Sequence, residues 1–219
     1  MQLPPLEYTH KTHPRSRSIK IKVLPDTRLE VVTPPGTDRD SIDRFLVSQL
    51  GWVERTRRRL GRLPVVWDDQ RVMLFGEYYQ LRRLADADRL PAIAIDGQSL
   101  LVSAPTGRDQ VRLRRFLRHT AQAYITPRAH QLANQMEVTF SSLGLREQRT
   151  RWGSCSRHGH LSFNWRLVHA PPAVIDYVII HELAHLEHLN HSRRFWEVVG
   201  QYDPQYADRR WWLSRHRLV

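Results

Sequence analysis

Three histidines and a glutamate with the spacing of metal ligands and a catalytic base lie in the C-terminal part of the chain. His181 and His185 are four residues apart, so on a helix they share one face and can reach a single metal ion. Glu182 follows the first ligand and can hold the water that a metal activates. His191 has the reach of a third ligand arriving from beyond the helix end. Three protein ligands with one open position are typical of catalytic Zn²⁺.

The residues before the motif predict the helix that this spacing requires. Ala170-Pro171-Pro172 fits the first turn of a helix, where proline is tolerated. Residues with the apolar spacing of a buried helix face follow: Val174, Ile175, Val178 and Ile179. Asn190 favours a left-handed turn that would end the helix and bring His191 back to the metal. The alternative is a set of ordinary histidines on a polar helix face, but charged groups in a buried helix need a partner.

His188 is a competing candidate for the third ligand. It lies three residues after His185, but on the helix that already supplies two ligands. We therefore favour His191 and interpret His188 as a residue that faces solvent or supports a ligand. The donor that would share the charge of an attacked carbonyl oxygen stays open among Tyr202, Arg151 and His188.

Composition and charge restrict the class of protein. The 219 residues are 41% hydrophobic, which is enough for a packed core, and the net charge is +12. That charge favours attraction to nucleic acid or another polyanion, although an arginine-rich surface without a specific partner explains it equally well. No apolar run is long enough to cross a membrane, and the N-terminus does not have the pattern of a signal peptide. With Cys155 as the only cysteine, we expect a cytoplasmic protein that does not contact a membrane.

Hydrophobic periodicity predicts an α+β fold. Alternating patterns predict strands at 6–10, 18–24, 28–33, 72–75, 78–84, 92–95, 99–103, 137–140, 147–152 and 161–164. Helical spacing predicts a helix from Thr37 or Asp38 to about Leu60, one over 109–136 that Pro127 should kink or split, the metal helix, and two short C-terminal helices. We expect a β-rich N-terminal region with one helix over residues 1–105 and a catalytic region over 106–219.

The motifs of the C-terminal half resemble those of the YgjP-like family, bacterial metal-dependent hydrolases of the zincin class that are related to the SprT-like and WLM metalloproteases. The matching segments are Arg151-Trp152-Gly153-Ser154-Cys155-Ser156, Asn164-Trp165-Arg166-Leu167, Ala170-Pro171-Pro172, Ile175-Asp176-Tyr177-Val178, His181-Glu182-Leu183-Ala184-His185 and Asn190-His191-Ser192 with Phe195-Trp196. The resemblance implies a zincin-like catalytic half of helices and a small sheet, Zn²⁺ bound by His181, His185 and His191, and Glu182 as the base. Ala184 departs from the cysteine of many members, but it lies between the ligands.

The leading interpretation is a zinc metallopeptidase acting on proteins or peptides. Trp152, Gly153 and Ser154 are candidates for substrate binding, because an extended peptide can add to a sheet edge and glycine permits close approach. Equally, Trp152 could pack under the metal helix while Gly153 forms a bulge. Two other functions stay open: a DNA-associated protease or nucleic-acid-binding protein of SprT-like type, and a zinc hydrolase of a non-peptide amide. The sequence does not indicate an oligomeric state.

Overall fold

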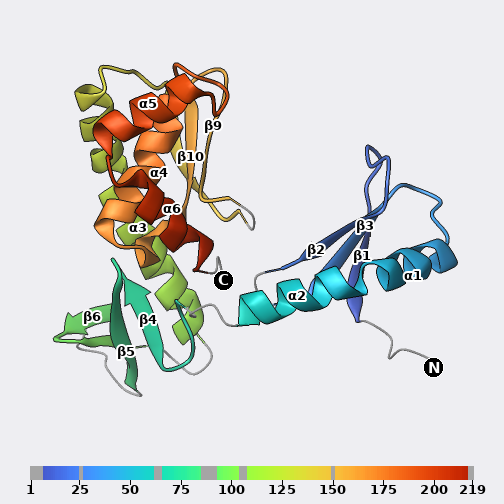
Figure 1. Ribbon diagram of the computed structural model, residues 1–219. Coiled ribbons are helices and arrows are strands. Elements are labelled where there is room, and N and C mark those ends of the chain that lie inside the picture. Colours follow the sequence, from blue (N-terminus) through green and yellow to red (C-terminus); the bar gives the residue numbers. More distant parts are fainter. Residues whose placement is uncertain are drawn as a thin grey trace. The chain divides into compact units, whose positions relative to one another are not determined.

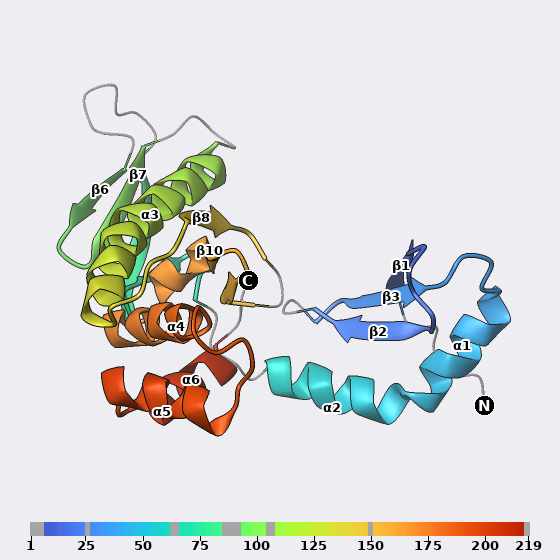
Figure 2. The same ribbon diagram turned by 90° about the horizontal axis from the view of Figure 1, so that it is seen from above.

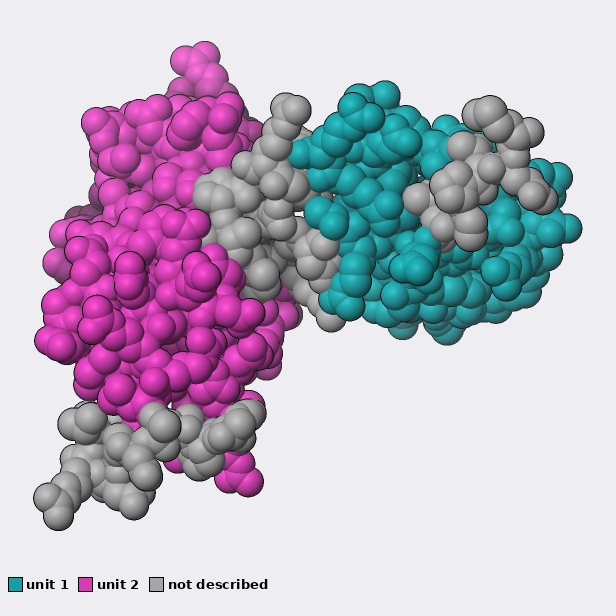
Figure 3. All heavy atoms as spheres, turned by 90° about the horizontal axis from the view of Figure 1, so that it is seen from below, with its two compact units in different colours: residues 1–64, 219 teal, residues 65–218 magenta. Residues whose placement is uncertain are grey.

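A computed structural model describes residues 7–24, 27–61, 66–84, 93–103, 108–148 and 151–216 (Figure 1). The chain forms two compact units, one made of Met1–Pro64 with Val219 and the other of Val65–Leu218 (Figure 3). Among the described residues, no helix is both long and apolar enough to span a bilayer. The predicted α+β class is confirmed, since each unit combines helices with small mixed sheets.

The first unit is a three-stranded sheet and two consecutive helices. Its elements are β1 (Tyr8–Thr12), β2 (Lys20–Val23), β3 (Leu29–Thr33), α1 (Arg39–Ser48) and α2 (Leu50–Gly61). The central strand β3 pairs in parallel with β1 and antiparallel with β2. Val31 of this strand is buried against Ile42 and Leu46 of α1, which gives the sheet an apolar face covered by a helix. The carboxylate of Asp38 caps α1 by accepting the N–H of Ser41.

The second unit contains two sheets. One has the strand order β4-β5-β7-β6 and the other the order β8-β10-β9. Their strands are β4 (Arg71–Leu74), β5 (Glu77–Leu84), β6 (Ile93–Asp96), β7 (Ser99–Ser103), β8 (Ser142–Arg146), β9 (Gly153–Cys155) and β10 (His160–Asn164). In the smaller sheet β10 is central, parallel to β8 and antiparallel to β9, so β9 is an edge strand. Strand β9 packs next to the helix that carries His181 and Glu182.

One long helix joins the two sheets of the second unit. α3 (Asp109–Gln135) packs on β6, β7 and β8 and on the ligand-bearing helix (Figures 1 and 2). Its buried side chains recur at helical spacing from Leu113 to Leu132. Pro127 does not split this helix as the sequence suggested. It lies on the exposed side, where the carbonyl that lacks its N–H partner can bond to water.

The metal helix is central in this unit. α4 (Pro172–Ala184) has buried residues on all sides and packs against α3, β9, α5 (Arg193–Tyr202) and α6 (Tyr206–Ser214) (Figure 2). A helix that is apolar all round belongs in a core, and here its last turn carries the histidines and the glutamate into partial or full burial. Pro172 occupies the first turn, as the sequence predicted.

The turn between β4 and β5 is bonded to the segment that leads into α4. This segment is the short 3₁₀ helix η1 (Trp165–His169). The N–H groups of Phe75 and Gly76 donate to the carbonyls of Val168 and His169, at 2.8 and 3.2 Å. Gly76 has φ +89°, and a Cβ there would lie 2.8 Å from the ring of Pro171. Only glycine therefore allows this turn to approach the start of α4.

Several elements differ from the sequence predictions. The expected division at residues 105 and 106 lies outside the described residues and stays a prediction, while clustering of contacts divides the chain between 64 and 65. The helix predicted to end near Leu60 is interrupted at Gln49. Strands predicted at 137–140 and 147–152 are found at 142–146 and 153–155, while residues 6, 92, 149 and 150 of the predicted strands lie outside the described part. The hairpin through Asp96-Gly97 is present, with Gly97 at φ +52°.

Candidate metal centre

The three histidines of the motif come together in space. Ligand atoms of His181, His185 and His191 all lie within 4.8 Å of one another. The Nε2 atoms of His181 and His191 are 3.1 Å apart. Tetrahedral coordination with Zn–N bonds of about 2.0–2.1 Å places ligand nitrogens about 3.4 Å apart, so the spacing suits one shared ion. Among the described residues this cluster contains His191 and does not include His188.

Each imidazole is oriented by its neighbours. Nδ1 of His185 lies 2.9 Å from the carbonyl oxygen of His188, which favours the tautomer that leaves Nε2 free to bind a metal. The ring of Phe195 is fully buried and contacts all three histidine rings, with centroid distances of 4.6–4.9 Å. Trp196 stacks on His191 at 5.7 Å. The cluster is therefore held by one backbone hydrogen bond and by the rings of Phe195 and Trp196 of α5, which we call the aromatic floor.

The path of the chain to His191 differs from the prediction. α4 already ends at Ala184, with His185 as its C-cap, and Asn190 does not adopt the left-handed conformation. Instead the side-chain oxygen of Asn190 accepts the N–H of Ser192 at 3.3 Å. Ser192 then caps α5 by accepting the N–H of Phe195. The loop that presents His191 is thus fixed by the start of α5, which also supplies the aromatic floor.

Burial favours the neutral form of the His181 and His191 imidazoles. It lowers the pKa of His181 to about 3, and the charges of His185, His191 and Arg210 act in the same direction. The pKa of His191 is also lowered, mainly by burial. Neutral imidazole is the form that binds a metal, because the lone pair of the ligating nitrogen must be free. The donor set and its spacing fit a divalent ion of the zinc type.

Glu182 is buried beside the histidines and under β9. Its side chain accepts a hydrogen bond from the backbone N–H of Cys155, and the positive charge of Arg151 acts on it. Burial outweighs both effects and raises the pKa of this carboxyl to about 7. A Cβ on Gly153 would lie only 2.6 Å from Oε1 of Glu182. Gly153 is therefore required by the close approach of strand and carboxyl, and it does not form the bulge considered from the sequence.

The register of β9 determines which of its backbone groups face outward. The N–H of Asn164 in β10 donates to the carbonyl of Trp152, and the N–H of Ser156 donates to the carbonyl of His160. Ser154 opposes Ser162 between these two pairs. In an antiparallel pair hydrogen-bonded positions alternate, so the N–H and C=O groups of Gly153 and Cys155 face the free edge. The bond from Cys155 to Glu182 agrees with this assignment. The backbone of Gly153 thus points to the side of the sheet on which the metal helix lies.

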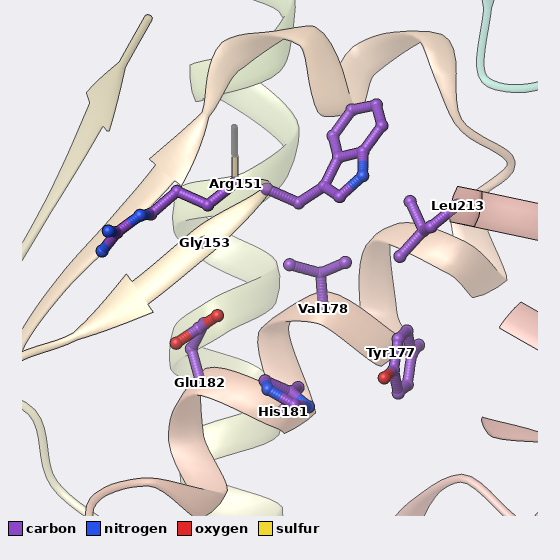
Figure 4. A pocket seen from close by; sticks show the side chains of 8 residues that line it. Arg151, Gly153, Tyr177, Val178, His181, Glu182 and Leu213 are labelled. Atoms are coloured by element: carbon purple, nitrogen blue, oxygen red, sulfur yellow. The ribbon is translucent and has the colours of Figure 1, made fainter. Parts of the chain in front are cut away.

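A pocket of about 220 Å³ opens beside His181 and Glu182 (Figure 4). It is lined by Arg151, Trp152, Gly153, Tyr177, Val178, His181, Glu182 and Leu213. In Figure 4 the side chain of Arg151 lies toward the Glu182 end of the pocket, and Tyr177 and Leu213 lie toward the other end. Tyr177 and Leu213 were not identified from the sequence, since both read as ordinary core positions of helices. Of the three residues considered for the attacked oxygen, Arg151 alone lines this pocket.

Other residues singled out in the sequence have structural roles. Asn164 is fully buried, and its amide donates to the carbonyls of Gln148 and Arg151 at 2.6 and 3.3 Å. It therefore holds the segment that leads into β9 and does not bond to a ligand histidine. Arg166 pairs with Glu147 at 2.9 Å. Burial and the charge of Glu182 raise the pKa of Cys155 to about 11, so this thiol stays protonated and is not an activated nucleophile.

Two histidines at the end of a helix, a third from the loop that follows and a buried carboxyl under an edge strand form an arrangement typical of metal-dependent hydrolases of the metallopeptidase class. The chain belongs to the YgjP-like family: the sequence model of the YgjP-like metallopeptidase domain matches residues 17–216. The resemblance noted in the sequence is thereby confirmed, and the protein is a metal-dependent peptidase.

Two solved structures are similar to part of the chain. The metallopeptidase zymogen of Pyrococcus abyssi abylysin is 19% identical with a TM-score of 0.38, over 43% of this chain and 99% of that one. The metallopeptidase zymogen of Methanocaldococcus jannaschii jannalysin is 18% identical with a TM-score of 0.37, over 41% of this chain and 92% of that one. Among curated proteins, none matches.

Proposed function

We propose that the protein is a zinc-dependent peptidase in which His181, His185 and His191 hold the ion and Glu182 is the general base. Zn²⁺, when bound by these three residues, supplies a Lewis acid and lowers the pKa of water. The observation that carries the proposal is the buried carboxyl of Glu182 next to the histidine cluster. With a pKa near 7, this group can accept a proton from the attacking water and later deliver it to the leaving amine.

The edge strand β9 is the proposed guide for the substrate. The outward N–H and C=O of Gly153 can pair with an extended peptide, which places the peptide along the side where Glu182 lies. Trp152 and Ser154 contribute differently, because their backbone groups are used by β10. Trp152 offers its indole to the pocket, and Ser154 keeps β9 in register.

The dimensions of the pocket favour a peptide over a small amide. Pockets that enclose a drug-sized molecule have volumes of about 300–1,000 Å³. The space beside Glu182 is about 220 Å³, which suits one side chain of a longer substrate. The open edge of β9 continues the site beyond this pocket, as a polypeptide needs and a small molecule does not.

The test is Glu182→Gln in protein whose bound zinc is quantified. We expect the variant to keep its metal and to cleave a labelled unfolded protein about 10²–10⁴-fold more slowly, since it lacks the proton acceptor. Glu187→Gln removes an exposed carboxylate near the same helix end and is the control. Full activity of Glu182→Gln with zinc in place would exclude Glu182 as the base.

Nucleic acid is a second proposed partner, motivated by the net charge of +12. The first unit contributes exposed arginines such as Arg55 and Arg58 on α2, together with the half-exposed Trp52. Running the same assay with and without single-stranded DNA tests this partner. Stimulation that weakens steeply with salt would support it, and the absence of any DNA binding at low salt would exclude it.

A further inference from the structure

The pocket beside Glu182 has ends of different chemistry. One end is lined by Val178, Tyr177 and Leu213, which are apolar apart from one phenol group (Figure 4). On the opposite side Arg151 lines the pocket, and its side chain extends past Glu182 with the guanidinium farthest from Tyr177 and Leu213. Of the groups on which hydrolysis is proposed to depend, Glu182 lies on the side of Arg151, and His181 lies between Glu182 and Tyr177 in Figure 4. A substrate bound across the reacting groups would therefore meet an apolar surface on one side and a positive charge on the other.

Arg151 is exposed and available for a ligand. No carboxylate among the described residues lies within ion-pair distance of it, in contrast to Arg166, which pairs with Glu147, and Arg128, which pairs with Asp176. Its backbone is nevertheless fixed, because its carbonyl accepts the buried amide of Asn164. An arginine with an anchored backbone and a free guanidinium at a pocket is suited to a planar anionic group, since its N–H donors match the two oxygens of a carboxylate.

We propose that Arg151 is a specificity-determining residue that binds a carboxylate of the substrate on one side of the cleaved bond, while the apolar end of the pocket binds a hydrophobic side chain on the other. This assignment rests on the proposed peptidase function and names its substrate class. Two sources can supply the carboxylate: an aspartate or glutamate side chain within the peptide, or the free carboxylate of a C-terminal residue.

Arg151 differs from an arginine that only solvates the surface, because it lines the pocket and its backbone is held there by the buried Asn164. Arg157, in the turn after β9, is such a residue: it is exposed, has no acidic partner among the described residues and does not line the pocket. The two arginines therefore form a matched pair for substitution.

Four peptides test the proposal, all acetylated at the N-terminus and carrying one leucine. Three are C-terminally amidated, with the leucine on one side of the candidate bond and glutamate, glutamine or lysine on the side opposite the leucine. The fourth has glutamine there and a free C-terminal carboxylate immediately after it. Binding is measured first, from tryptophan fluorescence of the Glu182→Gln protein, because Trp152 lines the pocket and this variant does not consume the peptide. Cleavage by the active protein is measured second as kcat/KM.

We expect the glutamate peptide to bind about three- to tenfold more tightly than the glutamine peptide, as a partly exposed charge-assisted pair allows, and the preference to weaken at high salt. Arg151→Gln should abolish the preference and Arg151→Glu should reverse it toward lysine, whereas Arg157→Glu should leave it unchanged. A reversal of this kind cannot come from a general loss of structure. If the free-carboxylate peptide shows the advantage and the glutamate peptide does not, the source is the chain end.

Equal binding of the charged and neutral peptides would overturn the proposal, as would an equal loss for all peptides in Arg151→Gln. A different result would contradict the proposed peptidase function, namely the absence of cleavage by the zinc-loaded active protein. The binding comparison in Glu182→Gln still decides the role of Arg151 in that case.

Discussion

Because Gly153 lies close to Glu182, the substitution Gly153→Ala tests whether the position of the Glu182 carboxyl matters for hydrolysis. A Cβ at position 153 would lie 2.6, 2.7 and 2.9 Å from Oε1, Cγ and Cδ of Glu182. Unstrained contacts between such atoms are about 3.5 Å, so the carboxyl group must retreat by about 1 Å. This retreat moves the carboxyl away from the N–H of Cys155, its backbone partner in β9.

We predict that Gly153→Ala lowers kcat/KM by about 10²-fold, because a misplacement of about 1 Å at a reacting group has an effect of this size. The overpacking should also reduce the free energy of unfolding by about 1–3 kcal/mol. Zinc content should stay at one ion per chain, since the three atoms nearest to the added methyl group all belong to Glu182 and not to a histidine. The assay combines peptidase kinetics, metal analysis and urea unfolding of the same preparations.

Gly144→Ala is the matched control. Gly144 lies in β8 of the same sheet, and no atom lies within 4 Å of a Cβ built there. This variant should keep wild-type kinetics and stability within experimental error. If Gly153→Ala retained more than about a third of wild-type activity while Gly144→Ala was also active, the carboxyl position described here would not be the one used in hydrolysis.

Two further predictions concern stability and metal affinity. Burial lowers the pKa of His169 from 6.5 to about 4, so on acidification the unfolded chain binds this proton first and stability is lost between pH 6.5 and 4. Urea unfolding of metal-free protein at pH 7 and pH 4.5 measures this loss. Between these pH values the free energy of unfolding of His169→Gln should fall by about 2–3 kcal/mol less than that of the wild type, and equal falls would contradict this account. Phe195→Leu should weaken zinc binding about tenfold in chelator competition, because Phe195 packs on all three ligand rings. Val199→Ala, at another fully buried position of α5, should not weaken it, and similar affinities for the two variants would refute a special role of the aromatic floor.

The candidate metal cluster was predictable because its signal in the sequence is local. His181, Glu182 and His185 fall within a single helical turn, and His191 lies only six residues beyond them. The long amphipathic helices and the Asp96-Gly97 hairpin were predictable for the same reason. Strand β9 was not, since three residues are too few to show alternation. Strand β8 contains Gly144, which weakens its pattern, and the backbone of Glu137 at φ +57° ends the preceding helix.

The surroundings of the site depend on long-range contacts that no local pattern reveals. Tyr177 and Leu213 come from different helices, and only the packing of α6 on α4 brings them to one pocket. The amide of Asn164 donates to the carbonyls of Gln148 and Arg151, a contact that the sequence pattern does not reveal. Gly153 was a candidate for substrate contact, but the sequence did not show that the side chain of Glu182 already occupies the space a Cβ would need.

The bonds from Phe75 and Gly76 to η1 affect how this enzyme can be shortened or recombined. A fragment starting at residue 106 would retain every candidate ligand and lose the hairpin that contacts Pro171 at the entrance to α4. The backbone carbonyls of Val168 and His169 would then lose their donors, and the first turn of the ligand helix would lose its support. In chimeric proteins and in evolution, we therefore expect functional junctions with new sequences to lie before β4, so that the four-stranded sheet stays together with the histidines.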